Sequence, residues 1–60
     1  NIGKTAVVIA DIDNLKAQGQ VKVGYTVWSA KSLNDTVITK DTKVIVKSIE
    51  GAKLVVETVD

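Results

Sequence analysis

The sequence TKVIVKSIEGAKLVVET, at residues 42–58, decides the fold of this chain. It holds two runs rich in β-branched residues, and a Glu-Gly pair separates them. In the first run Val44 and Val46 fall on one face of an extended chain and Ile45 falls on the other, which is the period of a strand. Gly51 follows, and glycine suits a short hairpin loop in which φ becomes positive. The stretch therefore predicts a β-hairpin.

The second run, residues 53–58, is apolar on both faces, because Leu54 and Val56 lie on one side and Val55 lies opposite. Strands of this kind are typical of the interior of a barrel or a sandwich. The whole chain contains 11 Val, 6 Ile and 6 Thr against 3 Leu and no Met, a composition that favours strands. We therefore expect an all-β fold.

Working outward from this hairpin, three more strands are expected at residues 5–10, 19–23 and 25–30. The second alternates apolar and polar residues, and the third continues after Gly24, where the chain can bend sharply. They are predicted to pair as a second hairpin.

Residues 11–18 interrupt the strand pattern. Two Asp and one Asn in this segment favour turns, because their side chains hydrogen-bond to nearby backbone groups. We expect an ordered loop here, from which Ile12 and Leu15 point inward.

Residues 31–41 form the least regular segment. In it Leu33, Val37 and Ile38 are spaced to cover one end of a barrel from a loop or a short helical turn. Five strands with a longer connection between the third and the fourth fit a small five-stranded OB-fold barrel better than a sandwich, which needs about seven strands. The prediction is one OB-fold domain over residues 1–60.

Composition excludes several classes of function. A chain of 60 residues buries only about 60% of the surface that its unfolded form exposes, so we expect modest stability or help from a partner. The absence of Cys and His excludes disulfides and the usual zinc and iron sites. The formal charge is +1, both signs are interspersed, and there is no Arg, so we expect no nucleic-acid partner.

The chain carries no membrane signal of its own. No apolar run approaches the roughly 20 residues that a membrane helix needs, and no signal-peptide pattern opens the sequence. We therefore expect a soluble domain. Because it begins at Asn1 without an initiator Met, we expect it to be a piece of a larger protein.

Candidate chemistry is sparse. Asp11, Asp13 and Asn14 could supply ligands for a hard cation, but a calcium loop needs six or more oxygens and a Gly and a Glu at set positions, which are missing. Ser29 and Lys31 share a strand face, yet a serine beside a surface lysine is ordinary. We predict no catalytic residue, no metal site and no cofactor, and hence no enzyme.

The two aromatic residues are Tyr25 and Trp28. Exposed aromatics on an OB barrel can stack nucleic-acid bases. Three positions apart on a strand, these two face opposite sides and cannot form one platform. We expect Trp28 to pack in the core and Tyr25 to be exposed near the bend at Gly24.

The order and spacing of several strand and turn residues resemble the carboxy-terminal soluble domain of the NfeD-like family. The resemblance spans nearly the whole chain and rests on Gly3-Lys4, GQVKV at residues 19–23, Gly24, WSA at residues 28–30, Ile38 and KVIVKSIEGAKLVVE at residues 43–57. The chain departs from the family in having no Pro at residues 16–18, and in having Asp41 where the family commonly has Gly.

The resemblance implies an OB-fold domain tethered behind transmembrane helices of a parent chain. It also implies a partner among membrane proteins of the stomatin, prohibitin and flotillin type, and a role in membrane organisation or quality control. Longer family members add a serine protease domain with a Ser-Lys dyad. That activity cannot be transferred to Ser29 or Lys31, because such a domain needs far more than 60 residues.

Two functional hypotheses follow. In the first, the chain is a protein-interaction domain that binds its partner through exposed apolar residues at Tyr25, Leu33, Val37 and Ile38. In the alternative, it is a small OB-fold module that binds single-stranded nucleic acid or an oligosaccharide, which requires an exposed Trp28.

Overall fold

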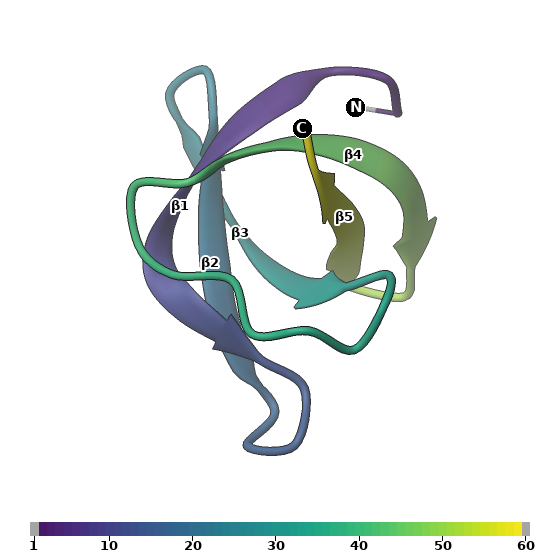
Figure 1. Ribbon diagram of the computed structural model, residues 1–60. Coiled ribbons are helices and arrows are strands. Elements are labelled where there is room, and N and C mark those ends of the chain that lie inside the picture. The colour runs from purple at the N-terminus through teal and green to yellow at the C-terminus, as the bar shows by residue number, and fades with distance from the viewer. Residues whose placement is uncertain (1, 60) are drawn as a thin grey trace.

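The computed structural model describes residues 2–59 as a closed five-stranded barrel (Figure 1). The strand order around the barrel is β1-β2-β3-β5-β4, and β4 returns to pair with β1. All neighbours are antiparallel except β3 and β5, which are parallel. The described residues contain no helix, so the predicted all-β barrel is confirmed. The strands are β1 (Thr5–Asp13), β2 (Gln18–Val23), β3 (Thr26–Ser32), β4 (Lys43–Glu50) and β5 (Lys53–Thr58).

The predicted hairpin at the carboxy-terminal end is formed by β4 and β5. Glu50 pairs with Lys53, which leaves a loop of Gly51 and Ala52. Gly51 has a φ of 58°. A two-residue loop with glycine in this conformation at its first position fits a type II′ turn, whose twist matches that of the two strands. The hairpin between β2 and β3, also predicted, has a loop of the same length.

One apolar core fills the barrel. Its largest fully buried side chains include Ile12, Leu54 and Val46. Trp28 is partly buried and packs against this core, so its predicted place in the core is confirmed only in part. The complete set of buried core residues is Ala6, Val8, Ile12, Val21, Ala30, Ile38, Val44, Val46, Leu54 and Val56.

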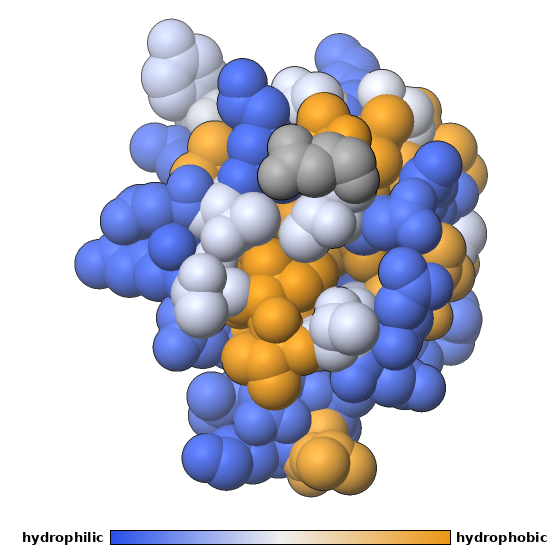
Figure 2. All heavy atoms as spheres, viewed as in Figure 1, coloured by the Kyte–Doolittle hydropathy of each residue, from blue (hydrophilic) through white to orange (hydrophobic). Residues whose placement is uncertain are grey.

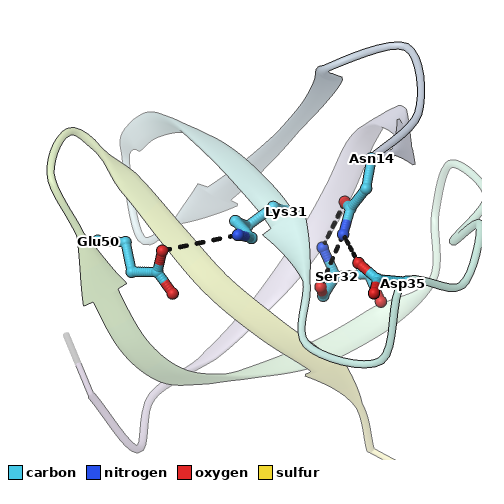
Figure 3. Close-up of polar contacts among 5 residues, drawn as sticks. All are labelled: Asn14, Lys31, Ser32, Asp35 and Glu50. Atoms are coloured by element: carbon cyan, nitrogen blue, oxygen red, sulfur yellow. Dashed lines mark hydrogen bonds and ion pairs between the residues drawn. The ribbon is translucent and has the colours of Figure 1, made fainter.

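Val55 is buried outside this core. It lies on the outer face of β5, yet only 2% of it is exposed. Its neighbours in the sheet are Lys31 on β3 and Ser48 on β4. An ion pair of 3.6 Å between Lys31 and Glu50 crosses β5 here (Figure 3). The apolar stem of the lysine therefore covers Val55.

The first strand extends further than predicted. The loop expected from residue 11 begins only after Asp13, because Asp13 pairs with Gln18 on β2. The backbone of Ile12 also pairs with that of Ile38 through hydrogen bonds of 2.8 and 3.0 Å. Ile12 is fully buried, as expected. The prediction for Leu15 was wrong, because its side chain is 100% exposed at the tip of the turn between β1 and β2.

The third strand runs over Thr26–Ser32, and the chain then crosses one end of the barrel before β4 (Figure 1). Of the three residues expected to cover this end, Ile38 is buried. Leu33 and Val37 are 47% and 61% exposed, so that part of the prediction was wrong. The pairing of Ile38 with Ile12 directs one side chain of the segment inward and leaves the other two at the surface.

Asp41 explains one departure from the family pattern. Its φ is 72°, and its N–H donates a 2.7 Å hydrogen bond to the carbonyl of Val8. This left-handed conformation is unfavourable for most residues with a Cβ but is tolerated by Asp and Asn. The backbone conformation at Asp41 therefore favours Gly, which is the residue that the family commonly has at this position.

Candidate interaction surfaces

The carboxylates and amide first considered as cation ligands have backbone partners. Asp13 Oδ1 accepts a 3.0 Å hydrogen bond from the N–H of Leu15, as expected for an Asx turn. Asp11 Oδ1 accepts a 2.7 Å hydrogen bond from the N–H of Lys40. Over residues 2–59, no group of three or more Asp, Glu, His or Cys side chains is arranged to hold a metal ion. These groups therefore hold loops against the barrel.

Asn14 joins two connections that are far apart in the sequence (Figure 3). Its amide donates to the carbonyl of Ser32 at 2.9 Å and accepts from the N–H of Ser32 at 3.0 Å. The same amide donates to Asp35 Oδ1 at 2.7 Å. Ser32 Oγ in turn accepts from the N–H groups of Asn34 and Thr36. This network fixes the start of the segment between β3 and β4.

That ordered segment presents a first surface, which we call the loop surface and define as Leu33 and Val37. The N–H of Leu33 donates a 2.9 Å hydrogen bond to the carbonyl of Val56, so its backbone is held against β5. Figure 2 shows an apolar area in the middle of this face, in the region where Figure 1 shows the segment crossing. Ile38, the third residue predicted here, is 3% exposed and belongs to the core.

Tyr25 lies elsewhere. It occupies the turn between β2 and β3 and is 100% exposed, which confirms its predicted exposure. Leu33 follows the opposite end of β3, a strand of seven residues. At about 3.3 Å per residue the two positions are separated by roughly 20 Å or more along the strand. The structure therefore divides the predicted contact residues between two ends of the barrel.

A third surface was not predicted from the sequence. Four residues on adjacent strands are direct neighbours across the sheet, with Lys43 beside Val7, Val7 beside Lys22, and Lys22 beside Val27. Residues directly opposite one another share a face of the sheet, and here it is the outer one. We call this set the valine–lysine row. The feature of the sequence that could have revealed this row is the two-residue period of a strand, which puts Val8 inward and Val7 outward.

The described residues contain no helix that is long and apolar enough to cross a membrane.

Comparison with known proteins agrees with this architecture. Residues 1–57 match the model of a protein family described as "NfeD-like C-terminal, partner-binding domain". A search of curated proteins found no match.

Two solved structures are similar over nearly the whole barrel. The C-terminal domain of stomatin operon partner protein 1510-C from Pyrococcus horikoshii has 30% identity and a TM-score of 0.85, over 98% of this chain and 88% of that one. The soluble domain of a membrane protein implicated in regulation of membrane protease activity, from Corynebacterium glutamicum, has 28% identity and a TM-score of 0.83, over 92% of this chain and 86% of that one. Because the family match covers all but three residues, this chain belongs to the family of NfeD-like C-terminal, partner-binding domains.

Proposed function

We propose that this chain is the non-enzymatic protein-interaction domain of a larger, membrane-anchored NfeD-like protein. Its partner is a membrane protein of the stomatin, prohibitin or flotillin type, and the pair acts in membrane organisation or quality control. Family membership supports binding of a partner. The names of the two similar structures, a stomatin operon partner and the soluble domain of a membrane protein, support the type of partner and the membrane anchor.

The observation that carries the proposal is the exposure of large apolar side chains on ordered backbone. Tyr25 is fully exposed in a two-residue hairpin loop, and the loop surface is held by the Asn14 network. An ordered backbone loses little conformational entropy on binding, which leaves more of the contact energy for affinity. These features are those of a binding surface for another protein.

The surroundings of Ser29 and Lys31 favour a role without catalysis. Lys31 forms the ion pair with Glu50 that crosses β5. Ser29 lies between Gln20 and Lys53 in the sheet. A serine nucleophile needs a base within hydrogen-bond reach, and the described residues show no such bond to Ser29. We therefore assign both residues to the sheet surface.

The nucleic-acid alternative receives less support from the aromatic residues. Trp28 packs against the core, and Tyr25 stands by itself at a hairpin tip. Base stacking along a strand of nucleic acid needs successive aromatic platforms. We expect single-stranded oligonucleotides to leave the fluorescence of Trp28 unchanged.

Calorimetric titration of this 60-residue chain with the stomatin-type protein of its source organism tests the proposal. We expect saturable binding. One of two changes, Tyr25→Asp or the double variant Leu33→Asp/Val37→Asp, should lower the affinity about five- to tenfold, because it would place a charge in an apolar contact. The two changes lie at opposite ends of the barrel, so each serves as the control for the other. Absence of heat from the folded wild-type chain would refute a stomatin-type partner.

A further inference from the structure

The valine–lysine row combines exposed apolar and basic side chains in a defined order. Val7 and Val27 are 41% and 51% exposed, and Lys22 and Lys43 are exposed beside them. Valine and lysine alternate across four strands, from β4 through β1 and β2 to β3. We propose that this row is a docking site for an extended, acidic segment of a partner protein, in which the side chains on one face, at every second residue, include both carboxylate and apolar groups. The inference rests on the proposed protein-binding function and names the chemistry of the bound segment.

The charges of the row are not balanced by the described part of the chain. The two ion pairs within residues 2–59 use Lys31 and Lys47, so neither Lys22 nor Lys43 has a carboxylate within 4.0 Å there. On β5, the strand beside β4, the Glu57 carboxylate already contacts Lys47 and Asn34. Two positive charges therefore lie two strands apart, at about 10 Å. Carboxylates from a partner would complement them.

The row also has the shape to receive a chain. A hollow of about 240 Å³ lies beside three of its four residues, Val7, Lys22 and Lys43, and is also lined by Thr5, Ala6 and Gly24. From Lys43 to Val27 the row spans three strand spacings, or roughly 14 Å. An extended segment of four or five residues covers that length.

The apolar members distinguish a protein segment from other anionic partners. Valine side chains are short and half-exposed, whereas lysine stems project from the sheet, so a flat bilayer surface would meet the lysines before the valines. A nucleic-acid backbone has phosphates for the lysines but no aliphatic groups for the valines. An extended peptide satisfies both when carboxylate and apolar side chains follow one another at every second residue, because those positions share one face. Tyr25, two residues before Val27, stands at the end of the row as a further apolar contact.

Amide shift mapping by NMR tests the site directly. The probe is an acetylated heptapeptide, Glu-Ser-Val-Ser-Glu-Ser-Val, which puts Glu and Val on one face of an extended chain, and its matched control has Gln in place of Glu. We expect shifts to concentrate at the four residues of the row and the affinity to fall as salt is raised. The double variant Lys22→Gln/Lys43→Gln should bind about three- to tenfold more weakly, because two surface charge pairs are lost. Lys16→Gln/Lys40→Gln removes the same charge from exposed positions outside the row and should bind like the wild type.

Several results would overturn the inference. These are shifts centred on the loop surface, equal binding of the Gln and Glu peptides, or equal weakening by the two double variants. If anionic vesicles or an oligonucleotide bind through the row and the peptide does not bind, the inference is also overturned in favour of that ligand.

Titration of the stomatin-type protein into the same variants separates the inference from the proposed function. If the partner binds the wild type and Lys22→Gln/Lys43→Gln equally well, the row is rejected and the proposed function stands. If the peptide maps to the row and the stomatin-type protein does not bind, the inference stands and the assigned partner is rejected.

Discussion

Gly19→Ala is expected to lower the free energy of unfolding by about 3 kcal/mol or more. A Cβ at Gly19 would lie 2.8 Å from the carbonyl oxygen of Ala30, 2.8 Å from Ile12 Cγ1 and 2.9 Å from Ile12 Cα. Two of these atoms belong to the backbone of neighbouring strands, so they cannot move without disturbing the barrel. The φ of Gly19 is 151°, a value that residues with a Cβ rarely adopt. Overpacking and backbone strain therefore act together.

The chain has little stability to lose. At about 0.05–0.15 kcal/mol per residue, 60 residues correspond to roughly 3–9 kcal/mol. The Gly19→Ala chain is therefore expected to lose a third or more of its stability, as urea titration followed by Trp28 fluorescence would report. Gly24→Ala is the matched control, because Gly24 also has a positive φ, of 61°, but no atom within 4 Å of an added Cβ. It should cost about 1–2 kcal/mol, and an equal loss in both variants would argue against the close contact at Gly19.

Val46→Ala is expected to lower the free energy of unfolding by about 2–3 kcal/mol. Val46 is completely buried in the barrel core, where it lies opposite Val56. Truncation removes two methyl groups from an apolar environment and leaves a cavity that the closed sheet cannot fill. Denaturant unfolding at equilibrium measures the loss as a shift of the midpoint at unchanged slope.

Val27→Ala provides the comparison for Val46→Ala. It is the same substitution in a strand, at a side chain that is 51% exposed. Surface substitutions away from special features usually change stability by less than about 0.5 kcal/mol. A loss that small for Val46→Ala would reject its place in the core.

The strands that could be predicted from the sequence are those whose pattern is local. Alternation in residues 42–58 and the Gly51 turn were sufficient for the β4–β5 hairpin, and the same signals gave β2 and β3. The extension of β1 to Asp13 was missed because it depends on pairing with Gln18 on β2 across two register shifts, and on a bridge to Ile38, a residue distant in the chain. Turn-forming Asp and Asn residues outweighed strand signals in the prediction, although the side chain of Asp13 does form the expected Asx turn.

The candidate surfaces were harder to predict, for a related reason. Periodicity assigns a residue to a face of a strand, but the neighbours on that face depend on the register between strands. Val7, Lys22 and Val27 become neighbours only through the pairing of β1, β2 and β3. Tyr25 could be predicted as exposed because a hairpin turn is a local feature. Leu33 and Val37 could not be distinguished from Ile38 without the position of the segment on the barrel.

Binding of a stomatin-type protein at the membrane is the central role that we propose for this domain. The most direct measurement places a photo-crosslinking amino acid at Tyr25, Leu33 or Val37 in the native protein, within source cells, and identifies the adduct in the membrane fraction by mass spectrometry. We expect an adduct with a stomatin-type protein from Tyr25 or from the loop surface. The proposal would be contradicted if the domain were found in the soluble fraction at the mass of this 60-residue chain and formed no stomatin-type adduct from any of the three positions.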